Sequence, residues 1–402
     1  MKNNNIMLNS PIRKEKILID GVIELRDVYK ININDLYYND KNGRIASFMA
    51  DYNANNINKL DSLDIVEYNN ILMEFIKNSG SKSKYKTTKD DISVNGQLKT
   101  GIILQDGRII DGNRRFTCLR ELYKETHNEK YMYFECFVLP VPKTQQDKIM
   151  IKSLELKYQF GEDSKEEYNP IDKLVDIYNN LVGPEKLFTV EEYRDRVNNQ
   201  LTTTRIKQSM EKAEIMVEFL NFINKPGRYD IARDMKLDGQ LQEIATFKKK
   251  LKDDKECKKV YPAIFQYMYT ETKGDRSRGI RPLLKLYDNN EKEFEQVKNH
   301  LINLAYQEDD LNKSTDIFEK EEKLKSIENT KNEYKKIILS ANSEINIKNA
   351  QKKQNDIIKS AISKMKEIDI FELKYLNEEL KNDFKNDIHK LESILEIIKK
   401  GI

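Results

Sequence analysis

The sequence predicts an α+β N-terminal domain followed by an all-α domain and a C-terminal region of long helices. Glycine and proline, the main helix breakers, are unevenly distributed. The eight prolines end at Pro282, and the last 120 residues contain a single glycine, Gly401. Strand-like alternation of apolar residues occurs in the first 145 residues. We therefore expect three regions, 1–145, 146–287 and 288–402.

Composition excludes several classes of protein. The 402 residues include 70 basic and 67 acidic side chains, for a net charge of +3, so binding of nucleic acid would need local basic patches. Charged residues are 34% of the chain, but 21 Tyr and 15 Phe argue against disorder. No apolar run approaches 18 residues, which predicts no membrane span, and the first residues lack the apolar core of a secretory signal.

Cysteine and histidine usage predicts a cytoplasmic protein without a zinc site. Cys118, Cys136 and Cys257 are widely spaced and odd in number, which is typical of a reducing compartment. The three histidines show no metal-ligand spacing with them.

The first region is expected to contain both strands and helices. Residues 29–36 alternate as in a strand, and residues 64–78 carry apolar side chains at helical spacing. Residues 79–89 are polar and rich in lysine, which predicts a loop. Residues 101–110 are two β-branched runs around Asp-Gly, a strong hairpin signal, and residues 131–141 predict another strand.

The most informative segment is Asp111-Gly112-Asn113-Arg114-Arg115, which follows the hairpin. Asn113 is a candidate helix cap, and the helix is expected over residues 114–124. Two arginines in a first turn oppose the helix dipole unless an anion binds there, and backbone N–H groups and guanidinium groups would then converge on a phosphate. Alternatively, the arginines point outward or pair with nearby carboxylates, namely Asp106, Asp111 or Glu135.

The order of strands and motifs in residues 28–142 resembles the ParB/sulfiredoxin superfamily. The resemblance lies in residues 95–120, which run from Asn-Gly-Gln-Leu through Asp-Gly to Asp-Gly-Asn-Arg-Arg, and in residues 39–44. It implies a nucleoside triphosphate, CTP or ATP, bound with Mg²⁺. The nucleotide-binding residues that it implies are Arg44, Gly96, Gln97, Gly112, Asn113, Arg114 and Arg115.

The departures from that family are also informative. Sulfiredoxins have a cysteine where this chain has Asn113, which argues against peroxiredoxin repair. Cys118 is expected to be a packed apolar residue. Glu155 matches the glutamate that would hold Mg²⁺, but Leu156 replaces the second ligand. Glu155 and Asp111 are the candidate catalytic carboxylates.

A helix-turn-helix is expected in the second region. Thr189 and Glu192 form a capping box that opens a helix over residues 189–197, and a second helix is expected over residues 203–219. The position resembles that of the DNA-binding domain in ParB proteins; a plain helical hairpin is the alternative. The residues expected to face the major groove are Thr203, Thr204, Arg205, Lys207 and Gln208.

Two basic clusters could neutralise DNA phosphates. Residues 247–259 contain seven lysines, and Arg276, Arg278 and Arg281 surround a turn bounded by Gly and Pro. Solvated charged faces are the alternative. In the third region, apolar residues recur every three or four positions from Leu376 to Ile398, which predicts a helix that pairs or braces two copies of the chain.

Three functions are compatible with these features. The first is a ParB-like DNA-binding protein whose grip on double-stranded DNA depends on a nucleotide at the Arg-Arg turn; the resemblance implies a homodimer and a partition-type ATPase partner. The second is a nucleoside triphosphatase or a nuclease on the same scaffold, in a mobile-element or phage-defence system. The third is a helical scaffold that acts through assembly alone.

Overall fold

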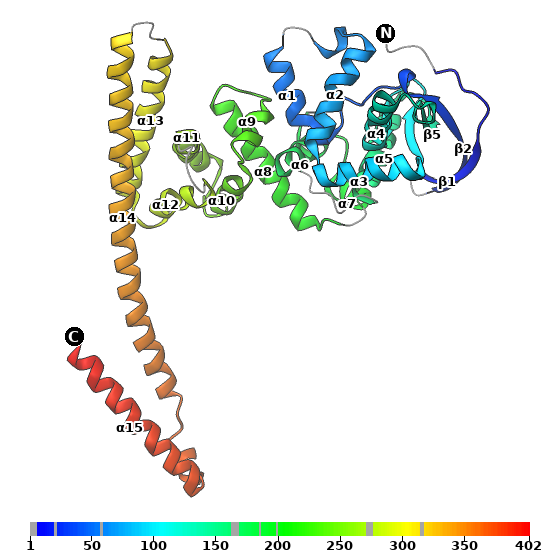
Figure 1. The fold of residues 1–402 in the computed structure, drawn as a ribbon. Coiled ribbons are helices and arrows are strands. Elements are labelled where there is room, and N and C mark those ends of the chain that lie inside the picture. Colours follow the sequence, from blue (N-terminus) through cyan, green and yellow to red (C-terminus); the bar gives the residue numbers. More distant parts are fainter. Residues whose placement is uncertain are drawn as a thin grey trace.

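The computed structural model describes residues 6–19, 22–56, 59–161, 169–184, 186–197, 200–270, 276–313 and 317–402. An N-terminal domain built around a sheet is followed by a helical body and then by a long helix that projects away from both (Figure 1). The predicted fold class is therefore confirmed. None of the described helices is both long and apolar enough to cross a membrane.

The described strands form one mixed sheet in the order β1-β2-β5-β3-β4. β1, β2 and β5 are antiparallel, β5 and β3 are parallel, and β3 and β4 form the hairpin expected around Asp106-Gly107. The strand bounds are Arg13–Ile19, Val22–Asn32, Gly101–Leu104, Ile109–Asp111 and Tyr133–Leu139. β2 ends at Asn32 because a 3-10 helix, Ile33–Asp35, begins there.

Helices cover both faces of the sheet around β3, β4 and β5, whereas β1 and β2 leave Leu18, Val22, Ile23 and Leu25 exposed. One face packs on α2 and α4 through residues such as Leu72, Phe116 and Phe134. The other face packs on α5 through Ile151 and Leu154. The boundary expected after residue 145 thus falls at the start of a helix that completes the core of the sheet. The bounds of the helices are α1 Ala46–Asn55, α2 Ile65–Ser79, α3 Lys82–Asn95, α4 Asn113–Thr126 and α5 Gln145–Gly161.

The helical body has its own apolar core, built mainly from α8, α10, α11 and α12. It is tied to the N-terminal domain through α1, where the backbone N–H of Ser47 donates to Asp172 Oδ1 at 3.0 Å and Arg233 donates to Ser47 Oγ at 3.1 Å. The bounds are α6 Pro170–Ile177, α7 Val190–Arg196, α8 Thr203–Phe222, α9 Tyr229–Asp234, α10 Asp238–Lys248, α11 Asp254–Thr270 and α12 Arg276–Asn289.

The C-terminal region consists of α13 (Glu291–Lys313), α14 (Ile317–Lys366) and α15 (Glu378–Lys400). The first half of α14 packs on the helical body through buried residues that end with Ile345. The second half of α14 and α15 extend beyond it (Figure 1). The long helices predicted for this region are present.

Three local predictions were wrong. Residues 79–89 are not a loop, because α3 begins at Lys82 and its Ile92 is buried in the core. The helix α4 is not capped by Asn113 but begins after Gly112, and Asn113 is its first residue. Arg276, Arg278 and Arg281 do not surround a turn, because α12 already begins at Arg276.

Candidate functional site

The Arg-Arg turn is shaped by one glycine. Gly112 joins β4 to α4 with φ of +96°, a left-handed conformation that favours glycine. A Cβ atom there would lie 2.8 Å from Cζ of Phe134. The turn therefore places Arg114 and Arg115 in the first turn of α4, as the sequence predicted, together with Asn113, which was expected to cap the helix.

These three side chains line a cavity of about 270 Å³. Its other walls come from the end of α2, from α3, and from the 3-10 helix Gly43–Ile45 that carries Arg44. Four cations (Arg44, Lys99, Arg114 and Arg115) and two carboxylates (Asp91 and Asp111) line it, so the wall carries two net positive charges.

Arg115 is held in place by Asp111, whose Oδ2 accepts a hydrogen bond from Nη2 at 2.7 Å. This pair is one of the alternatives that the sequence allowed. It leaves Nε of Arg115 buried and without a hydrogen-bond partner, and the same is true of Oδ1 of Asn113. A buried donor without a partner at a positively charged cavity is the local feature that an anion would satisfy.

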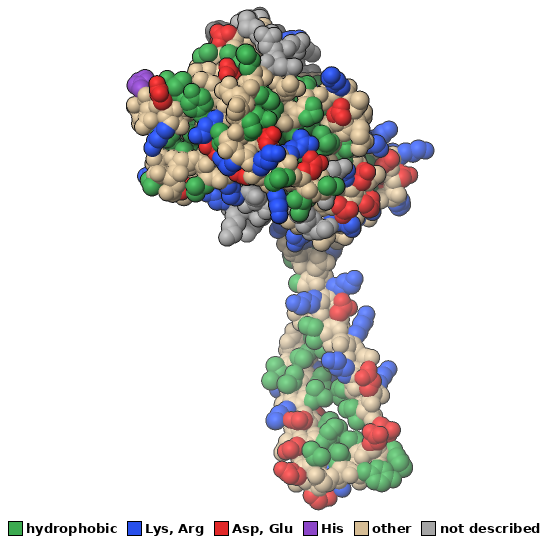
Figure 2. Space-filling view, turned by 90° about the vertical axis from the view of Figure 1, so that its right-hand side faces the viewer, with side chains coloured by type: hydrophobic (Ala, Val, Ile, Leu, Met, Phe, Trp, Pro, Cys, Tyr) green, Lys and Arg blue, Asp and Glu red, His purple; other side chains and the backbone are tan. Residues whose placement is uncertain are grey.

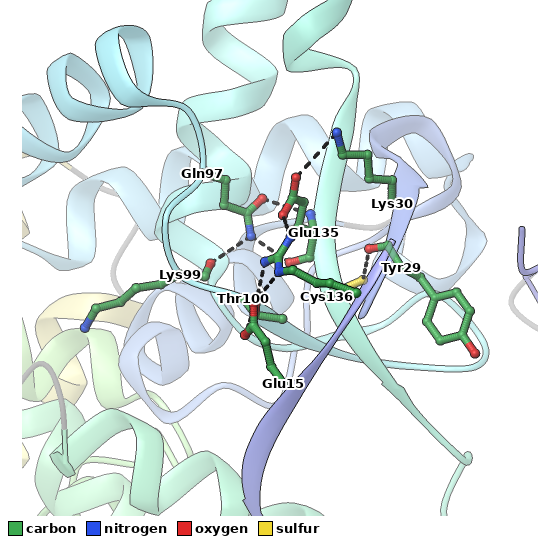
Figure 3. A network of polar contacts seen from close by, with 9 residues as sticks. Glu15, Tyr29, Lys30, Gln97, Lys99, Thr100, Glu135 and Cys136 are labelled. Carbon is green, nitrogen blue, oxygen red and sulfur yellow. Dashed lines mark hydrogen bonds and ion pairs between the residues drawn. The ribbon is translucent and has the colours of Figure 1, made fainter. Parts of the chain in front are cut away.

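The structure does not bring Gly96 and Gln97 to this cavity. Gly96 ends α3. The amide nitrogen of Gln97 donates to the backbone oxygens of Lys99 at 2.9 Å and Glu135 at 2.7 Å, and its oxygen accepts from the N–H of Glu135 at 2.9 Å (Figure 3). Gln97 thus fastens the chain before β3 to β5.

Glu155 lies in a different hollow, a cleft of about 1030 Å³ between the N-terminal domain and helices α5 and α6. The two cavities share Asn42 and Ile110 in their walls. Glu155 is buried and pairs with Lys152 at 3.4 Å. The second candidate carboxylate, Asp111, lines the arginine cavity instead.

Lys152 joins two helices through this charge cluster. Its Nζ also lies 3.0 Å from Oδ1 of Asp176 on α6, and the hydroxyl of Tyr193 on α7 donates to Oδ2 of Asp176 at 3.0 Å. Burial alone would lower the pKa of Lys152, but the carboxylates of Asp176 and Glu155 outweigh burial and hold that pKa above its ordinary value. The cleft is thereby connected to α7 through the hydrogen bond between Tyr193 and Asp176.

No metal centre is evident in the described part of the chain, where no three His, Cys, Asp or Glu side chains gather in a way that could hold a metal ion. Glu155 remains the predicted Mg²⁺ ligand. The thiol of Cys118 is buried, and burial raises its pKa to about 11. It therefore stays protonated at neutral pH, in agreement with the packed role expected for it.

Helices α7 and α8 cover the residues over which the two helices of the candidate helix-turn-helix were expected. The capping box of Thr189 and Glu192 is present. Tyr193, Val197 and Ile206 pack into one cluster that joins the two helices. Residues 198 and 199 of the connection lie outside the described residues.

The candidate groove-facing residues lie at the start of α8. Thr204, Arg205, Lys207 and Gln208 are exposed, and Thr203 is half-buried. Burial, and then the positive charges of Lys212 and Arg205, lower the pKa of the neighbouring Lys173. The exposed cations at this end of α8 are Arg205 and Lys207.

The basic clusters expected to neutralise DNA phosphates are partly paired with carboxylates. Arg281 is exposed and pairs with Glu243 at 2.7 Å. The side chains of Arg276 and Arg278 lie outside the described residues. Among the seven lysines of residues 247–259, Lys250 pairs with Asp288.

Sequence reasoning missed several wall residues of both cavities. They include Thr88, Asp91 and Lys99 of the arginine cavity. Thr88 was missed because residues 79–89 were expected to be a loop, whereas α3 begins at Lys82. Tyr85 and Ile92, seven residues apart, were the signal for that helix. The basic wall of the larger cleft was also missed, and it consists of Lys41, Arg108, Lys148, Lys152 and Lys186.

No protein-family model matches this chain, and no curated protein matches it. Among solved structures, it is similar to the C-terminally truncated chromosome-partitioning protein ParB from Caulobacter crescentus complexed with CTP-gamma-S. The match has 9% sequence identity and a TM-score of 0.19, and it covers 55% of this chain and 92% of that chain. A likeness at this TM-score carries no argument about function, which has to be argued from the residues themselves.

Proposed function

We propose that this chain binds double-stranded DNA through α8, and that a nucleoside triphosphate bound at the Arg-Arg turn alters its grip. The observation that carries the proposal is the convergence of Arg44, Arg114 and Arg115 with the start of α4 on one cavity. The positive end of a helix needs no added cations by itself, so arginines gathered there favour an anionic ligand.

The size of the arginine cavity indicates which part of a nucleotide it would hold. Pockets for drug-sized ligands measure about 300–1,000 Å³, and this cavity measures about 270 Å³. It therefore suits a phosphate chain better than a whole nucleotide. The guanidinium of Arg115 is already oriented by Asp111, and its buried Nε, which has no partner, is the N–H that a bound phosphate would engage.

A path for coupling the nucleotide to DNA runs through the shared wall of the two cavities. Asn42 and Ile110 separate the arginine cavity from the larger cleft. That cleft holds Asp176, to which Tyr193 of α7 is bonded. A phosphate that shifted Asn42 and the 3-10 helix after it would change the wall of the larger cleft. Through Asp176, that change would move α7 and alter the orientation of α8.

The test compares retention of labelled CTP, ATP and GTP on filters by wild type and by the double variant Arg114→Ala/Arg115→Ala. We expect the double variant to lose retention of whichever nucleotide wild type binds. Lys124→Ala, at the exposed far end of the same helix, is the matched control and should bind as wild type does. Equal retention by wild type and the double variant would show that the site is elsewhere.

A second assay measures DNA affinity with and without the nucleotide that is retained. We expect the nucleotide to change the affinity of wild type and to leave that of the double variant unchanged. The nucleoside triphosphatase or nuclease alternative stays a prediction without favourable geometry, because Asp111 and Glu155 line different cavities and each is in an ion pair.

A further inference from the structure

The larger cleft has the features of a ligand site of its own, in addition to its place on the path between Asn42 and α7. It lies between the N-terminal domain and helices α5 and α6, and it measures about 1030 Å³. Pockets for drug-sized ligands measure about 300–1,000 Å³. The cleft therefore has room for a whole metabolite, whereas the arginine cavity, with about 270 Å³, does not.

The described wall of the cleft carries more positive than negative charge. Its cations are Lys41, Arg108, Lys148, Lys152 and Lys186, and its carboxylates are Asp40, Glu155 and Asp176, which leaves two net positive charges. On the face of the body shown in Figure 2, Lys and Arg side chains are instead mixed with acidic ones. An excess of two charges in one hollow is therefore large for a chain whose net charge is only +3.

Three of these cations are not neutralised by a carboxylate. Lys152 is paired with Glu155 and Asp176, but among the described residues Lys41, Lys148 and Lys186 form no ion pair. Lys41 precedes the 3-10 helix Gly43–Ile45, Lys148 belongs to α5, and Lys186 follows α6. Because separate elements hold these like charges around one hollow, the cleft favours an anion that lies between them.

Arg108 adds an unused donor to the same wall. Its Nη2 lies 3.4 Å from Oδ2 of Asp106, but its Nε is buried and has no hydrogen-bond partner. Buried polar groups normally find a partner, so a donor of this kind at a basic cleft indicates an acceptor that binds there.

The polar, uncharged part of the wall is rich in carboxamides. They belong to Asn39, Asn42, Asn53, Gln145, Asn179 and Asn180. A carboxamide offers both donors and an acceptor, which suits the hydroxyl, amide or ring-nitrogen groups of an organic ligand better than it suits a bare anion. The wall therefore indicates a ligand with a polar body as well as a negative charge.

An irregular helix brings two of these carboxamides to the cleft. α6 continues as the π-helix Tyr178–Val182, where the N–H of Gly183 donates to the carbonyl of Tyr178 at 2.7 Å. The side chain of Asn180 is fixed, because its Nδ2 donates to the carbonyl of Asp176 at 2.7 Å, and Asn179 is exposed. π-helices are rare and are frequently found at functional sites, which supports a ligand site independently of the charges.

We propose that this cleft is a second ligand site, and that its ligand is a phosphomonoester with a polar body, such as a nucleoside or a sugar. A phosphomonoester carries about −1.5 to −2 charges at pH 7, which matches the two net positive charges of the wall. The lysines and Arg108 bind the phosphate, and the carboxamides bind the body. The site goes beyond the nucleoside triphosphate and DNA of the proposed function and rests on neither.

The first test is isothermal titration calorimetry of the full chain with CMP, AMP, ribose phosphate and inorganic phosphate. We expect one or more of the three phosphomonoesters to bind with one molecule per chain and more tightly than inorganic phosphate. The one that binds best distinguishes a nucleotide from a sugar phosphate. If none binds more tightly than inorganic phosphate, the proposal is wrong.

Variants then locate the bound phosphomonoester. Lys148→Ala/Lys186→Ala should weaken binding by about tenfold or more, because hydrogen bonds to a charged group are lost, and Lys148→Arg/Lys186→Arg should retain it. Lys143→Ala/Lys225→Ala removes two exposed lysines that do not line the cleft and should bind as wild type does. Wild-type affinity in the Lys148→Ala/Lys186→Ala protein would overturn the proposal.

The double variant Arg114→Ala/Arg115→Ala separates the two cavities. We expect it to bind the phosphomonoester as wild type does, even where it no longer retains a nucleoside triphosphate on filters. Loss of the phosphomonoester in this variant would place the ligand in the arginine cavity and exclude a second site. The absence of triphosphate binding in wild type would instead contradict only the proposed function.

Hydrogen–deuterium exchange provides a readout without substitutions. The bound phosphomonoester should slow amide exchange in residues 39–43 and 178–183, which contribute to the wall of the cleft, and leave residues 113–117 of α4 unchanged. Slowing confined to residues 113–117 would show that the ligand occupies the arginine cavity instead.

Discussion

At the scale of single residues, the backbone conformation of Gly112 sets the position of Arg114 and Arg115 at the start of α4. Its φ of +96° is strained for any other residue, and a Cβ atom would also meet Cζ of Phe134 at 2.8 Å. Gly96 has a φ of +74°, and nothing lies within 4 Å of the position that a Cβ atom would take. The variant Gly96→Ala therefore measures the cost of the backbone conformation without a steric clash.

We therefore expect Gly112→Ala to lower the free energy of unfolding by more than Gly96→Ala does. Left-handed backbone at a residue with a Cβ atom costs about 1–3 kcal/mol, and only Gly112→Ala adds a steric clash. Urea denaturation of the two variants measures the difference. Equal losses would mean that Phe134 moves aside and that the turn is less constrained than its geometry indicates.

Lys152 is the residue on which the buried charge cluster of the larger cleft depends. Because its pKa is raised by Asp176 and Glu155, its stabilisation is present at any pH below the ordinary lysine value and is lost only as the pH rises through the higher folded value. Replacing it leaves two carboxylates buried and without their cation.

We expect Lys152→Met to destabilise the fold by about 3–5 kcal/mol at pH 7, the usual effect of breaking a buried ion pair. Thermal unfolding at pH 7 measures this. Lys148→Met, another lysine of the same cleft wall, is the control and should unfold as wild type does. A Lys152→Met protein as stable as the Lys148→Met control would contradict the assignment.

At the scale of elements, local signals predicted some helices well and others poorly. The Thr189 and Glu192 spacing identified the start of α7 to the residue, because a capping box acts within four residues. The helix α3 was missed because it is polar and lysine-rich, and its stability comes from packing of Tyr85 and Ile92 on the core rather than from its composition.

The capping box makes a prediction about α7 at low pH. The backbone N–H of Thr189, and then its hydroxyl, lower the pKa of Glu192. The stabilisation is therefore present above the ordinary carboxyl value of 4.5 and is lost as the pH falls through the lower folded value.

We expect Thr189→Ala to cost about 0.5–2 kcal/mol, as N-cap losses do, and Glu192→Gln to flatten the acid dependence of unfolding. Glu191→Gln, an exposed neighbour outside the box, should leave that dependence unchanged. Denaturation at pH 7 and below pH 4.5 tests both. A Glu192→Gln protein with the acid dependence of wild type would exclude the contribution of the box.

At the scale of the whole molecule, the sequence predicted the order of the three regions but not the cavities that form between packed elements. The Arg-Arg turn, its helix and the strands on either side could be predicted from local patterns. The separation of Asp111 from Glu155 could not, because it depends on how α5 packs across the sheet and on where Asn42 stands. The apolar stripe from Leu376 to Ile398 was likewise predictable, but not that none of its residues is buried in the described structure.

The proposed DNA contact of α8 predicts a change in salt dependence. Lys207 is exposed beside Arg205 at the start of α8. A lysine that neutralises one phosphate releases about one counterion, so Lys207→Ala should weaken binding of all duplex sequences and reduce the slope of log affinity against log salt by about 0.9. Lys336→Ala, exposed on α14, removes the same charge elsewhere and should leave the slope unchanged. Titration of a labelled duplex at several salt concentrations measures both slopes. If the two variants have the same slope as wild type, Lys207 contacts no phosphate.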